Sequence, residues 1–188
     1  MKNIVNYLFL CIAVFALVSC NNKSTVKKEA ITETGTETTV RTGQAFIEDD
    51  GSRPNVLNIA LASEDHSILV QAVQAAELEN ALVNVGPLMV FAPINAAFEQ
   101  LPAGTLESLL KAENKDQLAF ILKHHVTPGN YDKEFLKKIR KLGQASNQNV
   151  AVTTEGDDVF IGGAKIIGSV PAGNGIVHIV DKVIIPEN

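Results

Sequence analysis

Cysteine is almost absent from the sequence, and the two that occur lie close together. The chain has 188 residues, and its only cysteines are Cys11 and Cys20, both within the first twenty positions. The rest of the chain therefore cannot be a disulfide scaffold, and it cannot hold a metal through cysteine thiolates. Any stability beyond residue 20 has to come from a packed core.

An excess of positive charge and a long apolar run are missing as well. The net charge is -5, which argues against a nucleic-acid partner because such partners reward clustered Lys and Arg. The longest apolar stretch, Ile4 to Val18, falls short of the roughly 20 residues that a membrane-spanning helix needs. With Lys2 ahead of it, this stretch is typical of a signal peptide.

The apolar stretch ends in Leu17-Val18-Ser19-Cys20, which resembles the lipobox of bacterial lipoproteins. This resemblance implies a lipoprotein signal peptide over residues 1–19 and lipid on Cys20. Asn21 resembles the residue found there in lipoproteins sent to the outer membrane. We therefore expect a lipid anchor in the outer membrane of a diderm bacterium, facing the periplasm, with surface exposure as an alternative. Ordinary secretion with a free Cys20 is the alternative to lipidation.

Residues 20–52 form a segment of different composition. Threonine recurs among Glu and Lys, and Phe46 is the only aromatic residue. Such a segment buries too little apolar surface to offset the entropy lost on ordering. It is predicted to be a flexible tether with a root-mean-square span of roughly 30 Å. The folded domain is expected over residues 53–188.

Beyond Arg53 the apolar residues are spaced as in amphipathic helices. Asn114 precedes the second stripe and is expected to cap its helix, with Gln117 completing a capping box. The third stripe is predicted to continue as a helix as far as Leu142. The three stripes run over 68–76, 118–122 and 135–142.

The last forty residues alternate as strands do. Val150 and Val152 precede the turn sequence "TTEGDD", and Val159 and Ile161 follow it, which predicts a hairpin with Asp157 and Asp158 at its tip. The stretch from Ile176 to Ile185 is β-branched on both faces and is predicted to be a strand buried on both sides. Together with the helical stripes, this predicts an α+β domain.

Three segments then resemble one family, the fasciclin domain. They are "VFAPINAAF" (Val90–Phe98), "ILKHHVTPGNY" (Ile121–Tyr131) and "NGIVHIVDKVIIP" (Asn174–Pro186), in the family's order and spacing. The resemblance implies a β-sheet wedge with several short helices packed on it. Ile94 replaces the usual Thr, and His124 replaces the usual Tyr. The signature positions carried over are Phe91, Pro93, Asn95, Phe98, His125, Pro128, Gly129, Asn174, Gly175, His178, Asp181 and Pro186.

The first signature is predicted to be a corner of the fold. Pro93 cannot donate to a strand ladder, so it suits the end of a strand. Asn95 is expected to cap the short helix that follows, since its side-chain oxygen can accept from an orphan backbone N–H. Phe91 and Phe98 are expected to be buried on the core side of the corner.

The sequence shows no catalytic constellation. His125 lies on an apolar face and His178 in an apolar strand, so both are expected to be buried and satisfied by a backbone carbonyl or by Asn174. The alternative is that the two histidines converge on a metal, but no HExxH spacing supports zinc. Ser169 lies outside any nucleophile-elbow motif. We therefore predict no enzyme activity, no metal and no cofactor.

The resemblance implies a non-enzymatic, membrane-tethered adhesion module that binds proteins or glycans of the envelope or of neighbouring cells. One alternative is a carrier of an apolar small molecule, because some fasciclin-like proteins bind carotenoids. Another is a passive structural protein of the outer membrane. The stretch "NKDQL" is similar to an integrin-contacting motif of some animal fasciclin proteins, which makes Asn114, Asp116 and Leu118 candidate binding residues.

Overall fold

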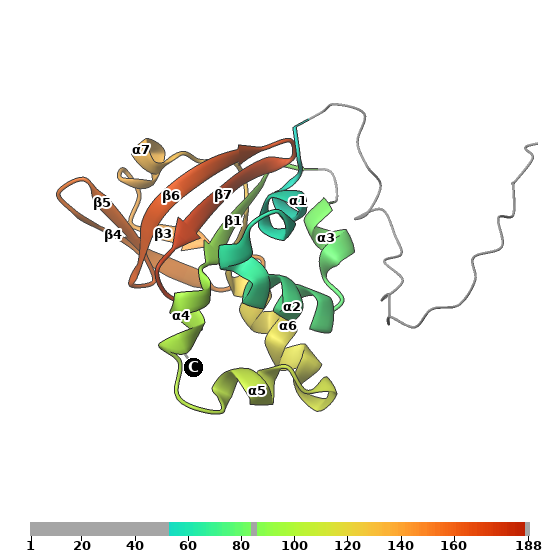
Figure 1. Ribbon diagram of the computed structural model, residues 1–188. Helices are drawn as coiled ribbons and strands as arrows, with labels where there is room; N and C mark the ends of the chain where they lie inside the picture. The colour runs from blue at the N-terminus through green and yellow to red at the C-terminus, as the bar shows by residue number, and fades with distance from the viewer. Residues whose placement is uncertain (1–52, 84–85, 187–188) are drawn as a thin grey trace, which may run out of the picture. The chain divides into compact units, whose positions relative to one another are not determined.

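The computed structural model describes residues 53–83 and 86–186. The expected signal peptide, Cys20 and the tether lie outside these residues. The strands of the described part form one seven-stranded sheet in the order β2-β1-β7-β6-β5-β4-β3 (Figure 1). Their bounds are β1 Leu88–Pro93, β2 Val126–Pro128, β3 Lys141–Gly143, β4 Asn149–Glu155, β5 Asp158–Ile161, β6 Ala164–Ala172 and β7 Gly175–Val180.

Only one strand pair of this sheet is parallel. β1 runs alongside β7 from the pair Leu88 and Gly175 to the pair Pro93 and Val180, and the other pairings are antiparallel. A parallel pair requires a long crossover connection, and here the crossover contains most of the helices. β1 and β7 therefore bring the first and last signature segments side by side.

The helices are short, and those before β2 lie together. Figure 1 shows α1, α2, α4, α5 and α6 on one side of the strands, with α7 apart from them. No helix in residues 53–83 or 86–186 has the length and apolar character that crossing a membrane requires. The α-helices are α1 Val56–Leu61, α2 Ser67–Ala75, α3 Glu79–Val83, α4 Asn95–Glu99, α5 Thr105–Leu109, α6 Lys115–His124 and α7 Lys133–Leu136, with 3-10 turns at Glu64–His66 (η2) and Ala112–Asn114 (η3).

Two apolar cores lie on opposite faces of the sheet because side chains alternate along a strand. On β1, Val90 and Ala92 join the core under the helices, whereas Met89 and Phe91 join the core on the other face. Phe98 of α4 belongs to the first core. Phe91 and Phe98 are thus both buried, as expected, but they pack into different cores.

The hairpin prediction is confirmed, and so are two of the predicted helices. β4 and β5 pair from Val152 and Ile161 to Glu155 and Asp158, and α2 and α6 cover the first two apolar stripes. The third stripe was interpreted wrongly. Its helix α7 ends at Leu136, and Leu142 lies in β3 opposite Val150. Pairing with β4 overrides a helical spacing that is only local.

The last strand is shorter than predicted. β7 ends at Val180 instead of reaching Ile185. The Asp181 carboxylate accepts a hydrogen bond from the Lys165 backbone N–H at 2.7 Å, and the chain then leaves the sheet. Ile184 is nevertheless buried and joins the second core. The apolar pattern beyond Val180 therefore indicates that the segment is buried, although it does not pair as a strand.

The predicted capping box at the start of α6 is wrong. Asn114 occupies the N-cap position, but its side chain makes no capping bond there. The 3-10 turn η3 runs directly into α6, so Asn114 lacks the extended backbone that capping needs. Its side-chain amide instead donates to the Ser108 carbonyl oxygen at 2.7 Å.

Asn95 acts on a different helix from the one predicted. Its side-chain oxygen accepts from the Ile68 backbone N–H at 3.1 Å, at the start of α2, and its amide donates to the Glu64 carbonyl oxygen and to Ser67 Oγ, each at 3.0 Å. It makes no capping bond to its own helix α4. Asn95 therefore fastens the β1–α4 corner to the first turn of α2.

Replacing Asn95 tests this assignment. Asn95→Ala should lower the free energy of unfolding by about 1–2 kcal/mol, because the Ile68 N–H loses its acceptor. Asn95→Asp keeps that acceptor and should lose less. Asn80→Ala, at an exposed position of α3, is the control and should stay within about 0.5 kcal/mol. Urea denaturation measures all three. Equal losses for the Ala and Asp variants at position 95 would contradict the assignment.

Candidate functional site

The signature residues meet where β1 and β7 pair. Phe91 lies opposite His178 in the parallel register, and their rings stack with centroids 5.7 Å apart. Gly175 begins β7 beside Leu88, and a Cβ at Gly175 would collide with the Leu88 carbonyl oxygen. Only glycine permits this close backbone approach. The residues of both signatures thus build the centre of the sheet.

His178 is completely buried, and both of its ring nitrogens are hydrogen-bonded. Nε2 lies 2.9 Å from the Tyr131 carbonyl oxygen, and Nδ1 lies 2.7 Å from Ser169 Oγ. A carbonyl only accepts, so Nε2 carries the proton and Nδ1 accepts from the serine hydroxyl. Burial lowers the pKa of His178, which keeps the ring neutral.

Nothing in the spacing of the sequence indicates the Ser169–His178 pair. The two residues are partners in the register of β6 and β7, and spacing along the chain cannot reveal a register. The arrangement resembles part of a nucleophilic dyad. Neither residue lines the apolar cavity or the polar groove described below.

His125 is buried at the end of α6 and is also satisfied on both sides. Nδ1 lies 2.9 Å from the Ile121 carbonyl oxygen, and Nε2 accepts from the Ile184 backbone N–H at 2.9 Å. Burial lowers the pKa of His125 to about 4. The ring therefore holds the C-terminal segment against α6, in the tautomer opposite to that of His178.

The adjacent ring of His124 points elsewhere. Its Nδ1 lies 2.9 Å from Ser146 Oγ, and it borders a polar groove of about 590 Å³ that also touches Lys141 and Asn149. His124 and His125 therefore cannot act as a chelating pair, as predicted. In residues 53–83 and 86–186, no group of three or more His, Cys, Asp or Glu side chains is placed to hold a metal.

Asn174 links two helices to the start of β7. Its side-chain oxygen accepts from the Val56 backbone N–H of α1 at 2.9 Å, and its amide donates to the Leu82 carbonyl oxygen of α3 at 2.7 Å. Of the two partners expected for the buried histidines, a backbone carbonyl is confirmed for both rings, whereas Asn174 bonds to neither.

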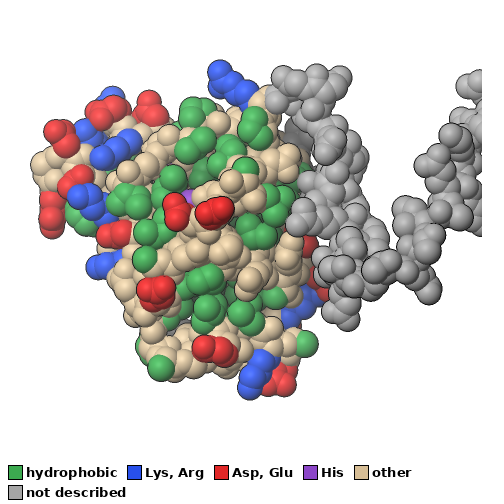
Figure 2. Space-filling view, in the orientation of Figure 1, with side chains coloured by type: hydrophobic (Ala, Val, Ile, Leu, Met, Phe, Trp, Pro, Cys, Tyr) green, Lys and Arg blue, Asp and Glu red, His purple; other side chains and the backbone are tan. Residues whose placement is uncertain are grey.

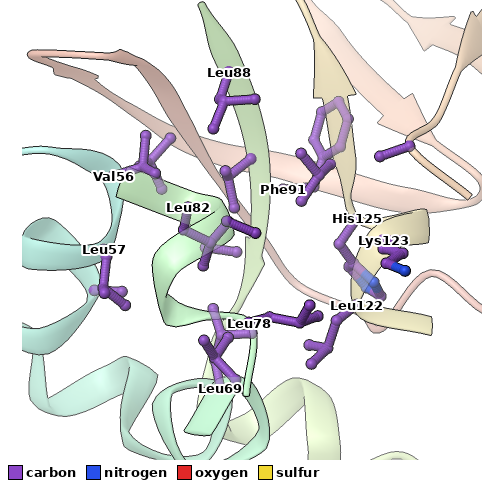
Figure 3. A pocket seen from close by; sticks show the side chains of 18 of the residues that line it. Val56, Leu57, Leu69, Leu78, Leu82, Leu88, Phe91, Leu122, Lys123 and His125 are labelled. Atoms are coloured by element: carbon purple, nitrogen blue, oxygen red, sulfur yellow. The ribbon is translucent and has the colours of Figure 1, made fainter. Parts of the chain in front are cut away.

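An apolar cavity of about 270 Å³ lies between α1, α2, α3, α6 and β1. Val56 and Leu82, the two residues whose backbone Asn174 holds, both line it. Figure 3 shows the lining side chains arranged around this space, with Leu88 and Phe91 contributed by β1 and with Leu122, Lys123 and His125 contributed by α6. Sequence reasoning missed the cavity, because its walls come from segments far apart in the chain.

The remaining signature residues shape turns and the chain end. Pro93 ends β1, as predicted, and is buried. Pro128 ends β2, and the N–H of Gly129 donates to the Pro87 carbonyl oxygen at 2.7 Å. Pro186 is the last described residue and lies beyond β7.

The three candidate binding residues of "NKDQL" differ in accessibility. Asp116 is exposed, whereas Asn114 is half-buried and bonded to Ser108. Leu118 is only 4% exposed and packs in the first core. In this conformation, Asp116 alone is open to a partner, and the binding hypothesis stays a prediction.

The surface carries both signs of charge. Figure 2 shows acidic and basic side chains intermingled around the β4–β5 end of the domain. Asp158 pairs there with Lys165 at 2.6 Å, and Lys137 pairs with Glu134 at 2.8 Å and with Asp157 at 3.3 Å. Such exposed pairs contribute little to stability, but they leave this end without a field of one sign.

The low pKa of His125 has a consequence for stability. Above about pH 6.5 the ring is neutral in both the folded and the unfolded chain. Between 6.5 and about 4 the unfolded chain binds a proton that the folded chain does not, so the free energy of unfolding falls as the pH falls. The loss from this one ring should reach about 3 kcal/mol.

The measurement is guanidinium denaturation of the full chain and of His125→Gln over that pH range. The variant should be less stable near neutral pH, and the difference between the two proteins should shrink as the pH falls. Parallel pH profiles would show that His125 titrates normally in the folded state.

Comparison with known proteins agrees with this architecture. The fasciclin domain family model matches residues 64–186. Protein sll1483 of Synechocystis sp. is 41% identical over 153 residues, covering 80% of this chain and 83% of that protein. The uncharacterized protein sll1735 of the same organism is 39% identical over 133 residues, covering 70% of this chain and 98% of that protein.

A solved structure shows the same fold at low identity. The FAS1 domain pair from the insect cell adhesion molecule Fasciclin I superposes with a TM-score of 0.63 and 16% identity. The match covers 71% of this chain and 51% of that chain. The α+β fold expected from the three signature segments is therefore confirmed, and the chain belongs to the fasciclin domain family.

Proposed function

We propose that the chain is a non-enzymatic interaction module that binds proteins or glycans of the cell envelope or of neighbouring cells. One observation supports the proposal most: the polar side chains of the signature segments are hydrogen-bonded inside the fold. His125 and His178 use both ring nitrogens, and Asn95 and Asn174 each connect separate segments. Because these side chains are already hydrogen-bonded within the fold, binding of a partner at the surface is the activity that the fold supports best.

The fold itself supports the same proposal. A FAS1 domain pair with this fold belongs to an insect cell adhesion molecule. Four large apolar side chains of the described residues are exposed on separate segments, and aromatic side chains are enriched at protein interfaces. Their exposed fractions are 39% for Phe120 on α6, 42% for Phe135 on α7, 52% for Ile167 on β6 and 59% for Ile185.

The proposal includes a position at the membrane. Lipid on Cys20, the lipobox residue, would hold the domain at the outer membrane of a diderm bacterium on its periplasmic side. A tether of about 30 residues would let it reach partners roughly 30 Å away. This address rests on the sequence before residue 53.

Site-specific photocrosslinking in intact native cells tests the module. A photoreactive residue at Phe120, Phe135, Ile167 or Ile185 should capture a defined partner from at least one position. The Cys20→Ala variant should leave the membrane fraction and lose that partner. A lipidated, unrelated domain carrying the same residue is the control. Capture no stronger than in this control would contradict the proposal, and retention of Cys20→Ala on membranes would contradict the anchor.

The apolar cavity favours a second function, that of carrying an apolar small molecule. Its volume of about 270 Å³ lies just below the range of about 300–1,000 Å³ for sites that enclose drug-sized ligands. A carotenoid is larger than such ligands, so the cavity could enclose only part of one. A smaller apolar molecule fits the space better.

Purification from the native host, followed by solvent extraction and mass spectrometry, tests the carrier function. One apolar compound should be recovered in near-stoichiometric amount, because a ligand enclosed by the cavity should dissociate only slowly during purification. Visible absorbance would indicate a pigment. A colourless preparation free of extractable compounds would contradict this second function.

A further inference from the structure

The chemistry of the cavity lining restricts what it can bind. Among the described residues that line it, Lys123 is the only one with a formal charge, and no lining residue is acidic. His125 is the other titratable residue there, and burial lowers its pKa to about 4, which keeps the ring neutral. The remaining walls are apolar side chains.

Lys123 stands at the edge of this lining. It is the penultimate residue of α6 and is exposed, whereas Leu122 and His125 are buried. Ala81 on α3 and Ala145 are exposed lining residues as well. Lys123 is therefore one of the places where the lining meets the surface, and it is the only charged one. Figure 3 shows Lys123 next to His125 and Leu122, across the cavity from Val56 and Leu57. A lysine in this position packs its stem against apolar surface and keeps its ammonium in water.

We propose that the cavity takes the hydrocarbon chain of a single-chain anionic amphiphile, with the acidic head group beside the Lys123 ammonium. This proposal rests on the second function above and specifies its ligand class. The apolar walls favour a hydrocarbon chain, and the lone cation at the rim favours an anion over a neutral or cationic head. No ion pair of Lys123 with another described residue competes for the ammonium.

The size of the cavity favours one chain. A volume of about 270 Å³ lies near the lower end for small-molecule sites, so a lipid with two long chains would leave one of them outside. Asn174 keeps the walls in place, since it holds the backbone of Val56 on α1 and of Leu82 on α3. The walls are thus fastened at the α1–α3 side, and the charged part of the rim is Lys123.

Calorimetric titration of the delipidated full chain at low salt tests the proposal with three probes that share a chain length: decanoate, decanol and decylamine. Decanoate should bind about two- to fivefold more tightly than decanol, the gain expected of an exposed ion pair. Decylamine should bind most weakly. Added salt should reduce the preference for decanoate.

Two charge variants locate the preference. Lys123→Glu should abolish the advantage of decanoate and strengthen decylamine by a similar factor. Lys138→Glu makes the same change at an exposed lysine that does not line the cavity, and it should leave all three affinities unchanged. A third variant, Ala60→Phe, places a ring among the lining residues and should weaken every probe at least tenfold while thermal unfolding stays cooperative.

The outcomes separate this proposal from the carrier function on which it rests. Equal binding of all three probes, unaffected by Lys123→Glu, would overturn the anionic class but leave an apolar carrier. Binding that survives in a folded Ala60→Phe protein would overturn the cavity as the site. Failure of every probe to bind the full chain would overturn both this proposal and the carrier function.

Discussion

The parallel pairing of β1 with β7 is the constraint on which the rest of the structure depends. It joins the first and the last strand of the domain, and every other strand is added to this pair by antiparallel pairing. Because side chains alternate across the sheet, the same pair supplies both cores, with Phe91 facing one and Val177 facing the other. The absence of a Cβ at Gly175 lets the two strands begin side by side.

The polar residues around this pair act as fasteners between distant segments. Asn95 holds the first turn of α2, Asn174 holds α1 and α3, and His125 holds the C-terminal segment that contains Ile184. Each bond gives a backbone group a partner, and a buried backbone group without a partner is costly. Polar residues in apolar surroundings often mark a catalytic site. In this fold they serve the packing of helices that are too short to be stable alone.

Much of the fold could be predicted from the sequence where the signal was local. The stripe beginning at Ile68 and the alternation around Val150 each depend on neighbours within a few residues, and both predictions hold. The failures share a physical cause. Leu142 has helical spacing but finds its partner on β4, and Asn95 lies beside one helix but caps another. Periodicity contains no information about partners that lie far along the chain.

The candidate site was predictable in part for the same reason. That His125 and His178 are buried and satisfied follows from their apolar surroundings, and the structure confirms it. Their actual partners depend on contacts far along the chain. Ile184 reaches His125 because the segment after β7 folds back against α6, and Ser169 reaches His178 through the register of β6 and β7. The cavity could not be predicted, because its volume depends on how the side chains of five separate elements pack against one another. Nothing in the sequence distinguishes Lys123 from the other lysines, and only the structure shows that it lines the cavity.

The central claim is that the polar groups of the signature segments are committed to the fold. Nitrogen-15 NMR of the imidazole rings at about pH 6, slightly below the ordinary histidine pKa of about 6.5, tests it most directly. The account predicts two neutral rings in fixed and opposite tautomers, with the proton on Nδ1 of His125 and on Nε2 of His178. Rings that are largely protonated at this pH, or that exchange between tautomers, would contradict it.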